Sequence, residues 1–239
     1  MVSPGLNASL MMEAESVCTS RLHRLKPYRF GWAKSKDAIE SRRRDTRFTF
    51  PEPTMIMQAD SPQMSRADFL GWESRQTGKH EFYQGEVFAM AGARQAHVIV
   101  AGNCFALLKA HLRGSGCRSF IADMQLEVQA VDAVFYPDVF VSGDPRDLAA
   151  ERVLAHPRVI VEVLSESTAA FDRGGKFAAY RTLPSLQEYV LIDPDRRSVE
   201  VFRRTATDDW LLAARDSARA LVLVSLDFEA GLTDVFEDF

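Results

Sequence analysis

The chain has 239 residues, 46% of them hydrophobic, and a formal net charge of −4. Its length supports one substantial hydrophobic core with an appendage and requires no second full domain. The charge is uneven, because residues 1–50 hold 10 Lys/Arg against 5 Asp/Glu, whereas residues 51–239 hold 19 against 28. A negative main domain argues against tight nonspecific binding to nucleic acid, since Lys and Arg supply most of that affinity by neutralising phosphates.

Two further absences bear on location and metal chemistry. No apolar stretch reaches the roughly 18 residues that span a bilayer, and the N-terminus lacks the pattern of a secretory signal. We therefore expect a soluble, cytoplasmic protein without a membrane partner. Cys18, Cys104 and Cys117 are odd in number and lack CxxC spacing, which argues against a disulfide framework and a thiolate zinc site. Any metal should be held by oxygen atoms.

Residues 1–63 differ from the rest of the chain. They show little sustained apolar periodicity, contain three consecutive arginines at 42–44 and close with a proline-rich stretch. This composition predicts a disordered or loosely attached extension before a domain at 64–239. A solvated tail is favoured over a nucleic-acid arm for the arginine cluster. The methionines at 55, 57 and 64 offer alternative start positions.

The first predicted elements are a helix, a hairpin and a second helix. Ser65 is a helix-capping residue, and apolar residues follow it at helical spacing to about residue 76. Residues 80–90 read as a hairpin that turns near Gln84 and Gly85. Apolar residues then recur at helical spacing from 95 to 113, where glycines end the helix.

Strands dominate the rest of the chain. Residues 118–128 alternate between apolar and polar, which predicts one half-buried strand. Strands at 136–141 and 159–165 follow, separated by a polar loop at 143–156 that either folds over a substrate or simply connects the two. The remaining prediction is a helix at 172–181 and strands at 188–192, 198–203, 210–213 and 220–224. This order indicates an α/β or α+β fold with a mixed sheet and helices packed on it.

Two acids stand out within these strands. Glu162 interrupts an otherwise apolar run, and Asp138 lies in the strand before it. A carboxylate in a strand buried on both faces costs several kcal/mol unless a cation or hydrogen-bond donors satisfy it. If the two strands pair, the acids lie about 5 Å apart and can share Mg²⁺, or Mn²⁺ in its place. Water polarised by such a metal can attack a phosphodiester.

A lysine on the next helix completes this set. Lys176 can orient or deprotonate the attacking water, and Tyr180 lies four residues on, hence on the same helix face. Gly174 and Gly175 allow another backbone or a ligand to approach closely. Arg173 is a poor base because its guanidinium stays protonated.

Five blocks of sequence carry a resemblance to a known family. They lie at residues 69–73, 81–87, 136–139, 161–165 and 172–181. Together they resemble the Uma two family of proposed bacterial endonucleases, within the PD-(D/E)xK superfamily and its restriction-endonuclease-like fold. The resemblance covers about residues 64–239. The family pattern is broken at Leu164, which stands where the superfamily motif has lysine.

The resemblance implies a mixed β-sheet flanked by helices, a magnesium site at Asp138 and Glu162, and hydrolysis of nucleic acid. It also implies that the migrated motif lysine is Lys176 and that the protein is a homodimer. Glu86, on the hairpin, is compatible with a supporting role at the metal, although an exposed acid beside a turn is the favoured interpretation.

Each candidate has an alternative that the residues leave open. Glu162 can instead form a buried ion pair with Lys176 or an arginine, and Asp138 can be a simple turn acid. Gln125 can hydrogen-bond the metal water or the phosphate, or belong to a solvated strand face. His97, in the first turn of the long helix, more often caps or packs than catalyses.

The sequence therefore predicts a magnesium-dependent endonuclease acting on nucleic acid, with DNA the expected substrate. Its catalytic residues are Asp138, Glu162 and Lys176, with Gln125 and Tyr180 in support. The principal alternative is a catalytically inactive module of the same fold that binds nucleic acid or protein. A purely structural assembly protein is the third interpretation.

Overall fold

The computed structural model describes residues 64–214 and 220–239, so the predicted extension at 1–63 lies outside the described residues. The helices are α1 (Arg66–Glu73), α2 (Gln95–His111), α3 (Pro145–Ala149), α4 (Ala169–Phe171), α5 (Phe177–Tyr180) and α6 (Leu232–Val235). A π-helical turn, η2 (Asp172–Lys176), joins α4 to α5, and short 3-10 turns span η1 (Gln129–Val131) and η3 (Val224–Leu226). None of the helices within the described ranges is long and apolar enough to cross a membrane.

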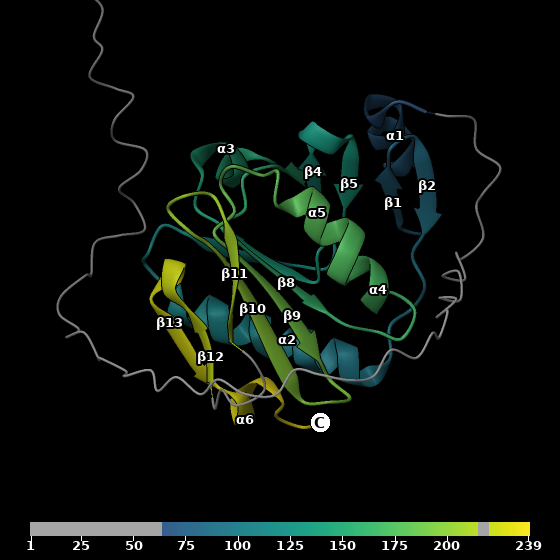
Figure 1. The fold of residues 1–239 in the computed structure, drawn as a ribbon. Coiled ribbons are helices and arrows are strands. Elements are labelled where there is room, and N and C mark those ends of the chain that lie inside the picture. Colours follow the sequence, from purple (N-terminus) through teal and green to yellow (C-terminus); the bar gives the residue numbers. More distant parts are fainter. Residues whose placement is uncertain (1–63, 215–219) are drawn as a thin grey trace, which may run out of the picture.

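The strands form three sheets (Figure 1). The five-stranded sheet has the order β2-β1-β5-β4-β7, from β1 (His80–Tyr83), β2 (Glu86–Ala89), β4 (Gln125–Val128), β5 (Ala133–Phe135) and β7 (Val153–Leu154). The six-stranded sheet has the order β11-β10-β9-β8-β6-β3, from β3 (Arg118–Ile121), β6 (Val139–Ser142), β8 (Val159–Val163), β9 (Glu188–Asp193), β10 (Ser198–Arg204) and β11 (Trp210–Ala214). A separate ribbon pairs β12 (Ala220–Leu223) with β13 (Phe228–Gly231).

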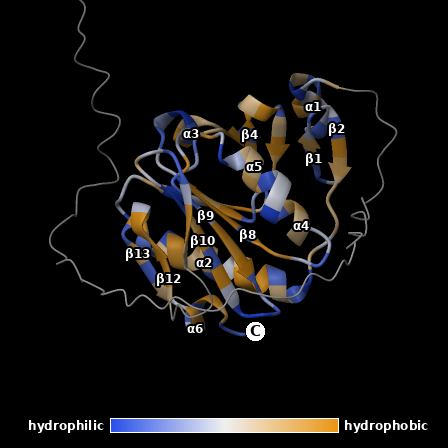
Figure 2. Cartoon of the chain, in the orientation of Figure 1, coloured by the Kyte–Doolittle hydropathy of each residue, from blue (hydrophilic) through white to orange (hydrophobic). Residues whose placement is uncertain are grey.

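The six-stranded sheet is mixed, because β8 runs parallel to β9 while the other neighbours are antiparallel. Valines on one face of this sheet, among them Val161, pack with α2 and the C-terminal ribbon in one hydrophobic cluster. On the opposite face, Phe140 and Ile160 pack with Phe135 of the five-stranded sheet and Tyr180 of α5. Figure 2 shows the resulting apolar colouring of β8 and β9. Both faces of β8 are covered, which explains its nearly continuous apolar sequence.

Most predicted elements are confirmed. The hairpin turns at Gln84 and Gly85, both of which have positive φ, and the long helix begins at Gln95 as expected. The fold class, a mixed sheet flanked by helices, is also confirmed. The C-terminal strand β13 and helix α6 were not predicted, because the segment is short and carries little periodicity.

One predicted strand is wrong in its continuity. The alternating segment 118–128 splits into β3 in the six-stranded sheet and β4 in the five-stranded sheet. Ala122 takes a left-handed conformation with φ of 52°, and its N–H donates to the Asp138 carbonyl at 3.1 Å. The alternating pattern continues across this break, so periodicity alone could not locate it.

The polar loop predicted at 143–156 contains regular structure. It forms α3 and then β7, which pairs in parallel with β4. Buried Asp147 accepts hydrogen bonds from the Ser142 hydroxyl at 2.7 Å and from the backbone N–H groups of Ala155 and His156 at 3.0 and 2.9 Å. These hydrogen bonds hold the segment 143–156 against the end of β6, so it forms an ordered connection between β6 and β8.

Candidate active site

The Asp138 and Glu162 carboxylates meet where the pairing of β6 with β8 ends. These strands are antiparallel with Val139 opposite Val161, so Asp138, the bend residue just before β6, lies beside Glu162 of β8. The strand predicted from residue 136 thus begins only at Val139. The Asp138 N–H donates to Glu162 Oε2 at 3.3 Å, and the Val163 N–H donates to Asp138 Oδ2 at 2.8 Å. The structure thus brings the two predicted acids together.

Lys176 joins this pair from the neighbouring helix. Its ammonium is buried and lies 2.9 Å from Glu81 Oε1, 3.4 Å from Glu162 Oε1 and 3.6 Å from Asp172 Oδ1. Tyr180, one turn further along, donates its hydroxyl to Glu162 Oε1 at 2.9 Å. One cation therefore faces three carboxylates in a part of the molecule with little access to water.

The π-helical turn η2 sets the direction in which Lys176 points. This turn carries Asp172 and Lys176 inward while Arg173 stays exposed and pairs with Glu200 at 2.6 Å. Such turns inside helices recur at functional sites. Gly175 within it is closely packed, because a Cβ at that position would lie 2.3 Å from the Phe171 ring. A larger residue at Gly175, the second glycine of the block at residues 172–181, would therefore clash with Phe171.

Burial and the excess of acids shift the protonation of this cluster. Desolvation raises the pKa of Glu162 well above its ordinary value, against the opposing attraction of Lys176. Burial likewise raises the pKa of Asp172. Burial disfavours the charged Lys176, but Glu162, Glu81 and Asp172 together outweigh it and raise the lysine pKa. Lys176 is accordingly a cation over the whole physiological pH range.

His97 contacts the other acid. Its Nε2 lies 3.1 Å from Asp138 Oδ2, and the side chains of the two residues are 17% and 21% exposed. Burial opposes a charged imidazole, but the hydrogen bond and the charge of Asp138 outweigh it and raise the His97 pKa. Helix α2 thereby supplies a partly buried imidazole whose charged form is stabilised by Asp138.

The two supporting residues Gln125 and Glu86 lie elsewhere. Gln125 donates to the Tyr136 hydroxyl at 2.9 Å on the α1 side of the five-stranded sheet. Glu86 is exposed on β2, the edge strand of that sheet, one strand further from the acids than β1. The hairpin acid that reaches Lys176 is Glu81 on β1.

Sequence reasoning therefore missed Glu81 and Asp172 and gave His97 no catalytic part. Glu81 belongs to one of the five blocks, but an acid in a four-residue strand gives no sign of which face is buried. Asp172 stands four residues before Lys176, and this spacing on one helix face was the available signal.

The donor set suits a hard divalent cation. Asp138 Oδ1 accepts no hydrogen bond from any described residue, and Glu162 Oε2 accepts only the bond from the Asp138 N–H among them. No group of three or more His, Cys, Asp or Glu side chains arranged to hold a metal occurs within residues 64–214 and 220–239. Two carboxylates with several retained waters are nevertheless a common protein ligand set for Mg²⁺.

Fold and site together define a restriction-endonuclease-like domain. In a comparison with solved structures, the chain matches the crystal structure described as "a putative nuclease belonging to DUF820" from Anabaena variabilis ATCC 29413 with a TM-score of 0.60. The match has 16% identity and covers 72% of this chain and 97% of that chain. At this identity the likeness establishes the fold.

Sequence comparisons supply the family. The family model described as "Uma2: Putative restriction endonuclease" matches residues 66–235. Two proteins of Synechocystis sp. (strain ATCC 27184 / PCC 6803 / Kazusa) are also similar. The chain is 34% identical to slr1290, over 70% of this chain and 88% of that protein. It is 36% identical to sll1609, over 66% of this chain and 90% of that protein. The chain belongs to the Uma2 family. Family and fold together support the general class of nuclease.

Proposed function

We propose that the protein is a metal-dependent endonuclease that hydrolyses phosphodiester bonds in nucleic acid, with DNA as the expected substrate. The observation that carries this proposal is the meeting of two carboxylates, Asp138 and Glu162, with the buried ammonium of Lys176 3.4 Å from one of them. Acids and a lysine in this arrangement suit hydrolysis at a phosphate, where negative charge must be neutralised.

Asp138 and Glu162 are the residues that would hold Mg²⁺ or Mn²⁺. A bound divalent ion would supply Lewis acidity and lower the pKa of a coordinated water. Asp138 offers Oδ1, while its Oδ2 is fixed by the Val163 N–H and His97. Glu162 is fixed through Oε1 by Tyr180. Each acid therefore has one oxygen that orients it and another that faces fewer partners.

Lys176 would act as a cation in this reaction. Its pKa is raised by the surrounding acids in the metal-free protein, so the ammonium is the form that pairs with them there. It would orient the attacking water through hydrogen bonding and offset the charge that develops on the phosphate. The second role expected from the sequence, deprotonation of that water, stays a prediction.

A cleavage assay with matched variants tests the proposal. Asp138→Asn and Glu162→Gln preserve side-chain shape and remove the charge, so both should lose nucleolytic activity in millimolar Mg²⁺ or Mn²⁺ by at least about 100-fold. Glu229→Gln, at an exposed acid on β13, is the control and should cleave at the wild-type rate. EDTA should abolish wild-type cleavage.

The alternative is a catalytically inactive module that binds nucleic acid or protein. Leu164 at the motif position and the ion pair between Lys176 and Glu162 favour it. Absence of calorimetric metal binding at millimolar Mg²⁺ and Mn²⁺, together with absence of cleavage, would establish this alternative. The homodimer and the cytoplasmic location expected from the sequence remain predictions.

A further inference from the structure

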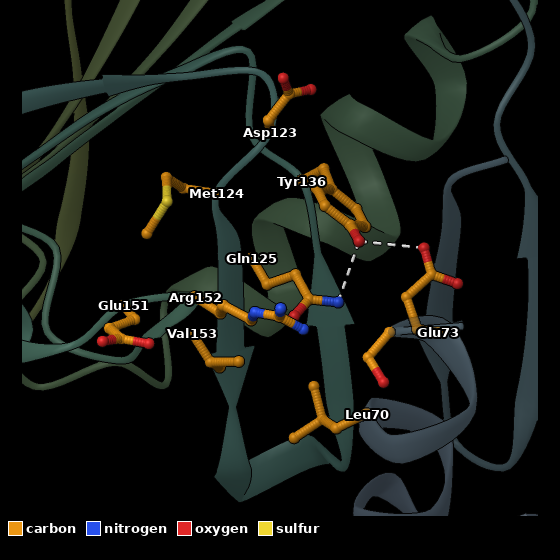
Figure 3. A pocket seen from close by; sticks show the side chains of 10 residues that line it. Leu70, Glu73, Asp123, Met124, Gln125, Tyr136, Glu151, Arg152 and Val153 are labelled. Carbon is orange, nitrogen blue, oxygen red and sulfur yellow. Dashed lines mark hydrogen bonds between the residues drawn. The ribbon is translucent and has the colours of Figure 1, made fainter. Parts of the chain in front are cut away.

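A pocket of about 300 Å³ opens on the α1 side of the five-stranded sheet. Figure 3 shows side chains from α1, from the segment entering β4 and from the segment entering β7 surrounding it. Leu70, Met124 and Val153 give it apolar walls, and Gln125 lies on the strand between them. The volume is at the small end for ligand sites, which suits one flat heterocycle.

Tyr136 connects this pocket to the acid pair. Its hydroxyl bonds to Gln125 and to Glu73, both at 2.9 Å, and lines the pocket. Its backbone N–H donates to Glu81 Oε1 at 3.2 Å, the same oxygen that contacts Lys176. Tyr136 precedes Asp138 by two residues, and two residues span at most about 7 Å. Tyr136 therefore lines the pocket with its side chain, while its backbone adjoins the segment that carries Asp138.

The pocket presents polar groups without internal partners. Gln125 is 8% exposed, and its amide NH₂ is used by Tyr136 while its carbonyl oxygen accepts no hydrogen bond from any described residue. The Arg152 guanidinium, on the pocket rim, likewise makes no hydrogen bond or ion pair within the described part of the chain. An acceptor that lines the pocket without a donor from the described residues is available to an incoming polar ligand.

The charges around the pocket determine which ligand fits. Three carboxylates line it, from Glu73, Asp123 and Glu151, against the single cation Arg152. Asp123 is paired with Lys79 at 2.5 Å, and Glu73 is occupied by His80 and Tyr136. An acidic rim disfavours a phosphate. An uncharged ring with amino donors and ring acceptors on one edge matches the Gln125 carbonyl and the Arg152 guanidinium.

We infer that this pocket accepts a single unpaired nucleobase of the nucleic acid whose phosphodiester is cleaved at Asp138 and Glu162. The inference rests on the proposed function and narrows it to substrates with an extrahelical or single-stranded base. A base inside a paired duplex has its edge engaged and its faces stacked, so it must leave the helix to enter a pocket. Apolar walls with one polar recognition edge are the surroundings that an unstacked base takes.

Binding in EDTA tests the pocket without involving metal or cleavage. Fluorescence anisotropy compares a labelled DNA duplex containing one unpaired base with the fully paired duplex. Wild-type protein should prefer the unpaired base by at least about tenfold. Gln125→Leu and Arg152→Ala should reduce that preference to within about twofold. Arg113→Ala, at an exposed arginine outside the pocket lining, is the matched control and should keep the preference.

Several outcomes would overturn the inference. Equal wild-type affinity for the two duplexes would do so, as would a full preference retained in Arg152→Ala, which changes an exposed residue with little risk to folding. If free adenosine or cytidine binds the pocket at millimolar concentration, and the protein shows no preference between the two duplexes, the pocket would be assigned to a free nucleoside instead.

Cleavage is scored separately in Mg²⁺ or Mn²⁺ so that the two proposals fail independently. A protein that prefers the unpaired base but cleaves nothing would keep the pocket and remove the proposed nuclease function. A protein that cleaves paired and unpaired duplexes equally, and whose pocket variants do the same, would keep the nuclease and overturn the pocket.

Discussion

The Glu162 carboxylate is only 3% exposed and lies between the Tyr180 hydroxyl and the Lys176 ammonium. Burial raises its pKa well above the ordinary value, so its ionised form is costly for the fold. The same ionised form is the one required to hold a divalent cation. A residue whose charge costs stability and is still present is best explained by a functional requirement.

Glu162→Gln separates these two demands. The amide keeps the shape and removes a buried charge that costs folding energy, but its NH₂ faces a donor that the carboxylate had bonded. The two effects oppose each other, so the melting temperature should stay close to the wild-type value. Cleavage should fall by at least about 100-fold, because an amide is a weak ligand for a hard cation. Differential scanning calorimetry and a cleavage assay on the same preparation give both results. Retained activity would contradict a metal-holding role for Glu162.

Lys176→Met should lower the stability. It leaves the buried Glu162 and Asp172 and the partly buried Glu81 without their shared cation, and removing one partner of a buried ion pair costs about 3–5 kcal/mol. Urea denaturation measures this loss. Adding Glu81→Gln to the lysine variant should recover part of it, since one uncompensated charge disappears. A loss below about 1 kcal/mol would show that the cluster is solvated.

His97 predicts a pH dependence of stability. Burial opposes its charge, but Asp138 outweighs burial and raises the His97 pKa in the folded protein above its ordinary value. Its contribution is therefore fully present below the unfolded pKa and is lost as the pH rises through the higher folded pKa. In EDTA, melting temperatures of wild type and His97→Asn should differ most below the ordinary histidine pKa of about 6.5 and converge as the pH rises through the raised folded pKa. A difference that grows with pH would refute this assignment.

At the scale of elements, the helix from Ala169 to Tyr180 is the part that positions the Lys176 ammonium. Its central turn is π-helical, and the Phe171 ring lies against Gly175. A Cβ added at the adjacent Gly174 would meet no atom within 4 Å. Two neighbouring glycines in one turn therefore have different steric surroundings.

Gly175→Ala and Gly174→Ala form a matched pair. The first forces Phe171 or the helix to move and should cost about 1–3 kcal/mol, with a loss of activity because Lys176 is displaced. The second fills open space and should be neutral or stabilising by up to about 1 kcal/mol. Chemical denaturation and cleavage assays compare them. Equal effects at the two sites would show that the packing of Phe171 does not control the turn.

The elements also show what the sequence could and could not predict. The long helix, the hairpin and the adjacency of Asp138 and Glu162 follow from periodicity and from strand order, and the structure contains them. The break at Ala122 is set by a tertiary contact, its hydrogen bond to Asp138, and no local pattern encodes it. Glu81 and Glu86 could not be ranked, because pairing between β1 and β5 decides which strand lies inside.

At the scale of the whole molecule, net charge bears on the proposed binding of nucleic acid. Residues 51–239 carry 19 Lys/Arg against 28 Asp/Glu, and this negative balance disfavours strong nonspecific binding to phosphates. Productive binding must then depend on local contacts, with a divalent cation offsetting the acids at the reaction centre. Affinity in the presence of EDTA is accordingly expected to be weak and selective for particular nucleic-acid structures.

The central claim is that Asp138 and Glu162 hold one divalent cation between them. A crystal soaked in Mn²⁺ tests it directly, because anomalous scattering locates the ion independently of any assay. We predict an anomalous peak at coordinating distance, about 2.0–2.3 Å, from an oxygen of each carboxylate, and its disappearance in Asp138→Asn. A fully soaked crystal without a peak between these carboxylates, or with manganese bound only elsewhere, would contradict the account.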